Sequence, residues 1–256
     1  MTYRSLSLYS PDFNPHGERK IESSAPPPGI RFRHIAFFLL GAILVGCLIG
    51  ALIGIAVYGV ARSNYVGEMV FAISLYATLI VGYHWTSQER EWTGLRARFS
   101  PVGKKPLILG ASAAVALVLF TWMVASLLEW AGVKVGEYPT PLVLPRDWKQ
   151  LPLAFFLLVI VAPMCEELIF RGLLLDWLKQ KMNVRLAALI LSMVFAALHD
   201  NAFAHGIIGW IIFSGRFLMG LAASAFAIKY RSLRPSTIMH GTLNGIACIS
   251  ELLGNA

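Results

Sequence analysis

The stretch PMCEELIFR, residues 163–171, places two adjacent carboxylates and one guanidinium inside an apolar run from Leu151 to Leu178. A run of this length can cross a bilayer as a helix. Each charged side chain at the centre of such a helix costs roughly 2.5 to 3.5 kcal/mol on insertion scales, so intramembrane charges indicate a functional site. The stretch therefore predicts a membrane protein with a polar centre in this helix.

Helical spacing divides these charged residues into a pair and a single carboxylate. Glu167 and Arg171 are four residues apart, so they share a face and are expected to form an ion pair. Glu166 points about 100° away and is predicted to be unpaired, which suits a general base. Pro163 cannot donate to the carbonyl of Val159, which predicts a kink and a polar gap one turn before Glu166. The alternative interpretation is a buried Glu-Arg clamp that ties helices together.

The composition places the chain in the membrane class. The 256 residues are 57% hydrophobic and only 14% charged, and the mean hydropathy is +0.64. Soluble domains have about 45–50% apolar and about 25% charged residues. The net charge of +8 comes mainly from Lys and Arg in short loops between apolar runs. We therefore expect membrane lipids as partners and no nucleic acid.

Apolar runs predict an all-α polytopic membrane protein with about seven transmembrane helices. The expected helices are residues 35–60, 66–85, 106–128, 151–178, 186–199, 206–230 and 235–253. We divide the chain into a flexible cytoplasmic tail (1–34), N-terminal membrane helices and loops (35–150) and a catalytic core (151–256). Alternate crossings put most loop Lys and Arg residues on one side, which predicts a cytoplasmic N-terminus. Compact size favours a bacterial inner (plasma) membrane.

Two further pairs at i, i+4 spacing lie in the later helices. They are Phe195 with His199, and His240 with Asn244. Any one of these residues alone could be a hydrogen-bonded contact between helices. Together with Glu166 they predict one polar catalytic cavity in the C-terminal half. His199 lies far along its helix and His240 near the start of its own, so we expect the fifth helix to tilt or to begin inside the membrane, with residues 172–185 dipping into the protein.

Three motifs, in order, carry a resemblance to a known family: Glu166-Glu167-x-x-x-Arg171, Phe195-x-x-x-His199 and His240-x-x-x-Asn244. They resemble the motifs of the CPBP family of intramembrane proteases, which includes the prenylated-CAAX endopeptidase. The resemblance covers residues 151 to about 253 and implies an endopeptidase for membrane-associated or lipidated substrates. It implies that Glu166 and His199 activate water, and that His240 and Asn244 stabilise the oxyanion or bind the polarised carbonyl. It gives Glu167, Arg171 and Phe195 the task of orienting these groups.

Other interpretations use the same residues. Glu166, His199 and His240 could hold Zn²⁺ in a metal-dependent form of the protease. The sequence has no His-Glu-x-x-His helix, so we favour a mechanism without a cofactor. A non-enzymatic scaffold or regulator would use the polar groups to bind other transmembrane segments, and a proton-coupled transporter would use them to carry protons.

Overall fold

The described part of the chain is helical. The computed structural model describes residues 31–61, 64–89, 93–136, 144–145, 147–199 and 204–254, and no strand occurs among them. Residues 1–30 of the predicted tail lie outside the described residues. Residues 32–34 were also predicted to belong to the tail, but they are the first residues of a helix that begins at Phe32.

All seven predicted helices are present, with ends that differ from the predicted ones by four residues or fewer. Their bounds are α1 (Phe32–Ala61), α2 (Asn64–Glu89), α4 (Lys104–Trp130), the long helix Leu151–Leu178, α8 (Val184–His199), α9 (Gly206–Tyr230) and α10 (Arg234–Gly254). A short helix, α3 (Leu95–Arg98), follows α2. Among the described residues, five helices are long and apolar enough to cross a membrane. The other two are α8, with 16 residues, and α10, which is less apolar. The protein is therefore an all-α polytopic membrane protein.

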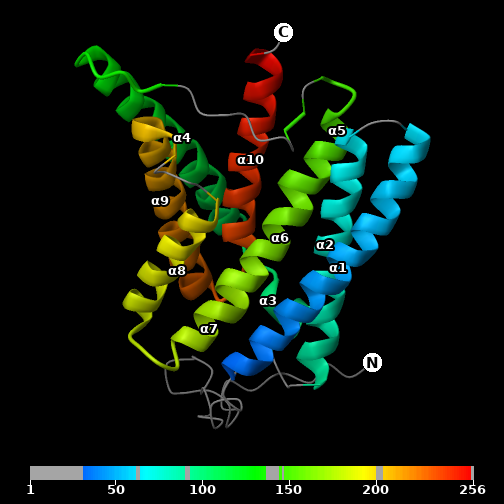
Figure 1. The fold of residues 1–256 in the computed structure, drawn as a ribbon. Coiled ribbons are helices and arrows are strands. Elements are labelled where there is room, and N and C mark those ends of the chain that lie inside the picture. Colours follow the sequence, from blue (N-terminus) through cyan, green and yellow to red (C-terminus); the bar gives the residue numbers. More distant parts are fainter. Residues whose placement is uncertain are drawn as a thin grey trace, which may run out of the picture.

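The long helix lies between two groups of helices (Figure 1). On one side α1 packs along α2, and on the other side α4, α8, α9 and α10 pack against one another. Two apolar clusters fill the interior, and the long helix contributes to both. Phe170 and Leu175 belong to the cluster beside α8 and α9, whereas Leu168 and Leu173 belong to the cluster beside α1 and α2. The helix that carries the acidic motif is thus the centre of the fold.

The long helix continues through Pro163 instead of breaking there. It consists of α5 (Leu151–Ala154), η1 (Phe155–Val161), α6 (Ala162–Glu167), η2 (Leu168–Leu174) and α7 (Leu175–Leu178), and η1 and η2 are π-helical. Directly before Pro163, the N–H of Ala162 bonds to the carbonyl of Leu157, five residues back. The widened turn accommodates the proline, so the expected kink with a polar gap is replaced by a π-bulge. This bulge packs against α10, where Gly241 lies directly on the carbonyl of Val159.

Residues 172–185 do not dip into the protein as predicted. The long helix continues to Leu178, the chain turns, and α8 begins at Val184. From there α8 packs against α9, and its C-terminal residue His199 reaches Glu166 on α6. The chain between α9 and α10 is held by α3, because the N–H of Leu233 donates to the carbonyl of Arg98 at 2.8 Å. These contacts bring the end of α8 and the start of α10 to the same part of α6.

Candidate active site

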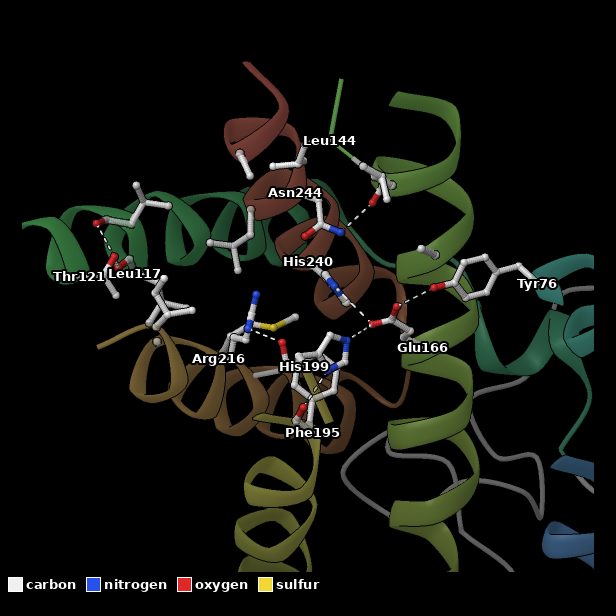
Figure 2. Close-up of a pocket in the computed structure, with 18 residues that line it drawn as sticks. Tyr76, Leu117, Thr121, Leu144, Glu166, Phe195, His199, Arg216, His240 and Asn244 are labelled. Atoms are coloured by element: carbon white, nitrogen blue, oxygen red, sulfur yellow. Dashed lines mark hydrogen bonds and ion pairs between the residues drawn. The ribbon is translucent and has the colours of Figure 1, made fainter. Parts of the chain in front are cut away.

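Glu166 is the meeting point of three helices (Figure 2). The hydroxyl of Tyr76, on α2, donates to its Oε1 at 3.0 Å. The Nε2 atoms of His199 and His240 lie 3.2 and 3.6 Å from its Oε2. The prediction that Glu166 is unpaired is therefore wrong. Spacing along one helix describes only the neighbours on that helix, whereas all three partners come from other helices.

The hydrogen bonds of His199 place a proton between this imidazole and Glu166. Nδ1 of His199 lies 2.7 Å from the backbone carbonyl of Phe195, which can only accept, so Nδ1 carries a hydrogen. In a neutral ring Nε2 is then an acceptor, and it faces a carboxylate oxygen. Two acceptors at 3.2 Å would repel, so the pair shares one proton, as imidazolium with carboxylate or as imidazole with carboxylic acid.

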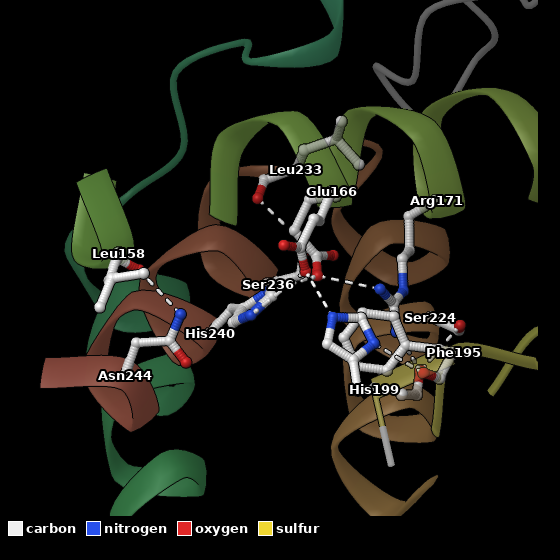
Figure 3. A network of polar contacts seen from close by, with 12 residues as sticks. Leu158, Glu166, Arg171, Phe195, His199, Ser224, Leu233, Ser236, His240 and Asn244 are labelled. Carbon is white, nitrogen blue, oxygen red and sulfur yellow. Dashed lines mark hydrogen bonds and ion pairs between the residues drawn. The ribbon is translucent and has the colours of Figure 1, made fainter. Parts of the chain in front are cut away.

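His240 contacts both carboxylates of the motif, and Figure 3 shows its ring directed at Glu166. Its Nδ1 is 3.4 Å from Oε1 of Glu167, and its Nε2 is 3.6 Å from Oε2 of Glu166. The side chain is 7% exposed, so these carboxylates dominate its surroundings. This position fixes the ring plane and places Nε2 beside Oε2 of Glu166 in the cavity wall.

Glu167 and Arg171 form the predicted ion pair, with 3.0 Å between Oε1 and NH1. Their side chains are 0% and 1% exposed. NH2 of Arg171 also donates to the carbonyl of Gly220, on α9, at 3.3 Å. The pair therefore joins the long helix to α9 and, through Glu167, orients His240. The Glu167–Arg171 pair therefore ties two helices together, as in the clamp interpretation, and it also contacts a histidine of the site.

Phe195 packs under both the ion pair and the histidine. The guanidinium of Arg171 lies over its ring at 4.7 Å from the centroid, and the His199 ring lies 4.2 Å from the same ring at 33°. Because the carbonyl of Phe195 also accepts from His199, residue 195 fixes this imidazole through both ring and backbone. The orienting function that the resemblance implies for Phe195 stays a prediction.

Asn244 lies in the cavity wall but is directed at a backbone group. Its Nδ2 donates to the carbonyl of Leu158 at 2.8 Å, so an oxyanion contact would require its second N–H. Arg216 lines the same cavity and donates from NH1 to the carbonyl of His199 at 2.6 Å. It therefore binds the C-terminal end of α8, where a cation is favourable.

Tyr76 is the residue that the sequence did not reveal. It belongs to none of the motifs and precedes Glu166 by 90 residues. Its one signal is a phenolic hydroxyl in the middle of an apolar run, which requires a partner at membrane depth.

The side chains surround a cavity of about 520 Å³. Its polar wall contains Tyr76, Glu166, His199, His240, Asn244 and Arg216. Most of the remaining lining consists of apolar side chains, which come from α4, the long helix, α8, α9 and α10 and from Leu144. Within the described residues, no three or more His, Cys, Asp or Glu side chains are arranged to hold a metal ion. The three side chains named for the zinc-dependent form nevertheless converge, because Nε2 of His199 and Nε2 of His240 face Oε2 of Glu166 at 3.2 and 3.6 Å.

Residues 148–246 match the family model described as type II CAAX prenyl endopeptidase Rce1-like. The match contains the acidic motif, both histidines and Asn244. The match covers less than half of the chain, and it supports the CPBP family of CAAX proteases for the part that carries the site. Together with the several apolar helices, it supports an intramembrane protease of the CAAX type. No curated protein and no solved structure matches it.

Proposed function

We propose that this protein is a CPBP-family endopeptidase that hydrolyses peptide bonds with water activated by Glu166 and His199. The observation that carries the proposal is the convergence of His199, His240 and Tyr76 on the Glu166 carboxylate in a cavity of about 520 Å³. A carboxylate beside an imidazole is a suitable general base, because both groups can accept and return protons.

The catalytic steps use protons that these residues can hold. The Glu166–His199 pair shares one proton at rest and takes a second from the attacking water. The resulting hydroxide bonds to the carbonyl carbon, and the carbonyl oxygen becomes an oxyanion. His240 and the second N–H of Asn244 donate to this oxygen. The pair then returns a proton to the amide nitrogen as the C–N bond breaks, which releases an amine and a carboxylic acid.

The proposed substrates are membrane-associated or lipidated peptides and proteins. The apolar cavity walls from α4, α9 and α10 support this class, because a peptide entering from lipid would remain among apolar groups until it reached Glu166. The proposal includes membrane lipids as surroundings and no nucleic acid as partner. It also includes a bacterial inner membrane and a cytoplasmic N-terminus. Seven crossings would then put the C-terminus on the opposite side of the membrane, so a cytoplasmic signal from a reporter fused at Ala256 would contradict this orientation.

The decisive experiment compares native protein with Glu166→Gln at matched levels in source cells. Mass spectrometry of protein termini should find new termini with the native chain and none with Glu166→Gln. Glu68→Gln, which changes an exposed carboxylate at the start of α2, is the control and should give the native set of termini. Identical termini in native and Glu166→Gln cells, with both proteins folded and inserted, would contradict catalysis by Glu166.

The same comparison tests the scaffold alternative. A scaffold that uses these polar groups as contacts would lose its assembly with any single substitution, whereas an enzyme would remain assembled and lose only hydrolysis. The native-state contacts of Glu167 and Arg171 are the part of the site that a scaffold would also need.

The zinc-dependent alternative is tested by chelation. We expect the purified protease to keep its full activity after treatment with a strong chelator and dialysis, because the proposed base needs no metal. Recovery of a lost activity on addition of Zn²⁺, with Mg²⁺ as the control ion, would replace the glutamate mechanism with the metal-dependent one.

A further inference from the structure

A second polar cavity, of about 440 Å³, lies at the C-terminal end of the long helix. Residues of α3, η2, α7, α9 and the loop after α9 line it. It shares no lining residue with the catalytic cavity among the residues that the structure describes. Four cations line this basic cavity, Arg98, Arg171, Lys179 and Arg231, and Asp176 is its one carboxylate.

Two guanidiniums in its wall have unused donors. Arg98 has a side chain that is only 10% exposed; its Nε donates to the hydroxyl of Tyr83 at 3.2 Å, and its NH1 pairs with Asp176. Its NH2 is buried and has no hydrogen-bond partner among the described residues, and the same is true of Nε of Arg171. Buried donors of charged groups are strongly destabilising when unpaired, so Arg98 requires an acceptor that these residues do not supply.

The other two cations of the basic cavity, Lys179 and Arg231, are exposed. Lys179 is held by an ion pair, and Arg231 has a strained backbone conformation. Nζ of Lys179 lies 2.5 Å from Asp176. Arg231 ends α9 with φ 49° and ψ 32°, and among the described residues it is the one non-glycine residue with a positive φ. Glycine is the usual residue at such a helix end, because any side chain is strained there. An exposed arginine in this conformation indicates a use for its charge.

The charges favour an anionic ligand. Asp176 is shared by Arg98 and Lys179, and Arg171 is neutralised by Glu167, so the positive charge of the basic cavity exceeds its negative charge. Burial lowers the pKa of Arg98, but Tyr83 and Asp176 raise it above its ordinary value, so this residue remains a cation. Arginine forks match the oxygens of a phosphate group, which accepts several hydrogen bonds at once.

We propose that the basic cavity binds a phosphate-bearing anion, whose oxygens accept from Arg98 and pair with Lys179 and Arg231. The phosphate can belong to a lipid headgroup or to a soluble compound, because both offer the same oxygens. A headgroup would reach the cavity from the anionic leaflet that attracts basic loops. This binding does not depend on the proposed catalytic function.

The test measures binding, not activity. Full-length protein in an uncharged detergent is titrated with inorganic phosphate while its melting temperature is followed. In parallel, native mass spectrometry compares retention of phosphatidylglycerol and phosphatidylcholine. Arg231→Gly is the decisive variant because it removes the charge and relieves the strain. Lys181→Gly, which removes an exposed cation outside the cavity, is the matched control.

The expected result is at least tenfold weaker anion binding by Arg231→Gly, with a melting temperature without ligand equal to or above that of the native protein. Lys181→Gly should bind as the native protein does. Loss of phosphatidylglycerol retention would identify a lipid headgroup, and loss of the phosphate effect without any lipid preference would identify a soluble phosphate compound. If neither probe binds the native protein, or if Arg231→Gly and Lys181→Gly bind equally, the proposal is wrong.

Discussion

The amide of Asn244 donates to the backbone carbonyl of Leu158 at 2.8 Å, and this carbonyl lies in the π-helical turn that precedes Pro163. In that turn the N–H of Ala162 bonds to the carbonyl of Leu157, five residues back. The next donor in the same pattern would be residue 163, which is proline and has no N–H. A side chain of α10 therefore supplies the hydrogen bond that the proline withholds from Leu158.

This relationship predicts coupling between Asn244 and Pro163. Asn244→Ala should lower the free energy of unfolding by about 1–3 kcal/mol, because it leaves a partly buried carbonyl without its donor. With Pro163→Ala, the new backbone N–H can bond to the long helix, and the cost of Asn244→Ala should fall by about 1 kcal/mol or more. A double-mutant cycle of unfolding in bicelles measures this difference.

Pro152→Ala provides the matched background for that cycle. Pro152 lies in the first turn of the same helix. A backbone N–H has no intrahelical acceptor there, so this proline removes no hydrogen bond from the helix. The cost of Asn244→Ala should therefore be unchanged in the Pro152→Ala background. Additive effects of Pro163→Ala and Asn244→Ala would show that the amide does not replace a missing backbone donor.

Two glycines of α10 predict a large difference between similar substitutions. A Cβ on Gly241 would collide with the carbonyl oxygen of Val159, whereas a Cβ on Gly245 would make ordinary contacts with the Val159 side chain, at 3.7 Å to Cγ2 and 4.0 Å to Cγ1. Gly241→Ala should cost about 1–3 kcal/mol of stability through overpacking. It should also reduce hydrolysis, because α10 must move and it carries His240. Gly245→Ala should be neutral or slightly stabilising, since alanine favours helix.

Thermal unfolding and hydrolysis rates of the two variants check this prediction. Equal effects of Gly241→Ala and Gly245→Ala would mean that the close approach of α10 to the π-bulge is not required for the site.

The sequence predicted those features that depend on residues close together along the chain. Apolar runs located the helices, and the four-residue spacing predicted the pair of Glu167 with Arg171, which the structure contains. The meeting of Glu166 with His199 and His240 was predicted from the costly polar residues in the later helices and from the family resemblance, but the contacts themselves were not, because no spacing relates three separate helices. The contacts agree with that prediction, while the catalytic functions of these residues remain to be tested.

Features that depend on backbone geometry or on a distant helix could not be predicted. Pro163 indicated a disturbed helix, but its missing N–H can produce either a kink or a π-bulge, and packing of α10 against Val159 and Leu158 accompanies the bulge. The donor to Glu166 from Tyr76 had no motif, and a tyrosine in an apolar helix can face lipid or protein with nearly the same local sequence.

Tyr76 gives the last prediction, which concerns the orientation of the base. Its hydroxyl donates to Oε1 of Glu166, which leaves Oε2 for the histidines. A hydrogen bond to a charged group contributes about 1.5–3 kcal/mol, so Tyr76→Phe should lower kcat/KM by roughly tenfold or more while the protein remains folded. Kinetics on a peptide found in the terminus experiment would measure the loss.

Tyr65→Phe is the control, because it makes the same change on the same helix. The Tyr65 hydroxyl contacts the carbonyl of Gln150 at 3.5 Å and does not line the catalytic cavity. Its removal should leave kcat/KM within about twofold, as expected for a weak contact away from the reacting atoms. If Tyr76→Phe were as active as Tyr65→Phe while Glu166→Gln was inactive, the histidines alone would be sufficient to orient Glu166, and the hydroxyl of Tyr76 would serve only to satisfy a buried carboxylate oxygen.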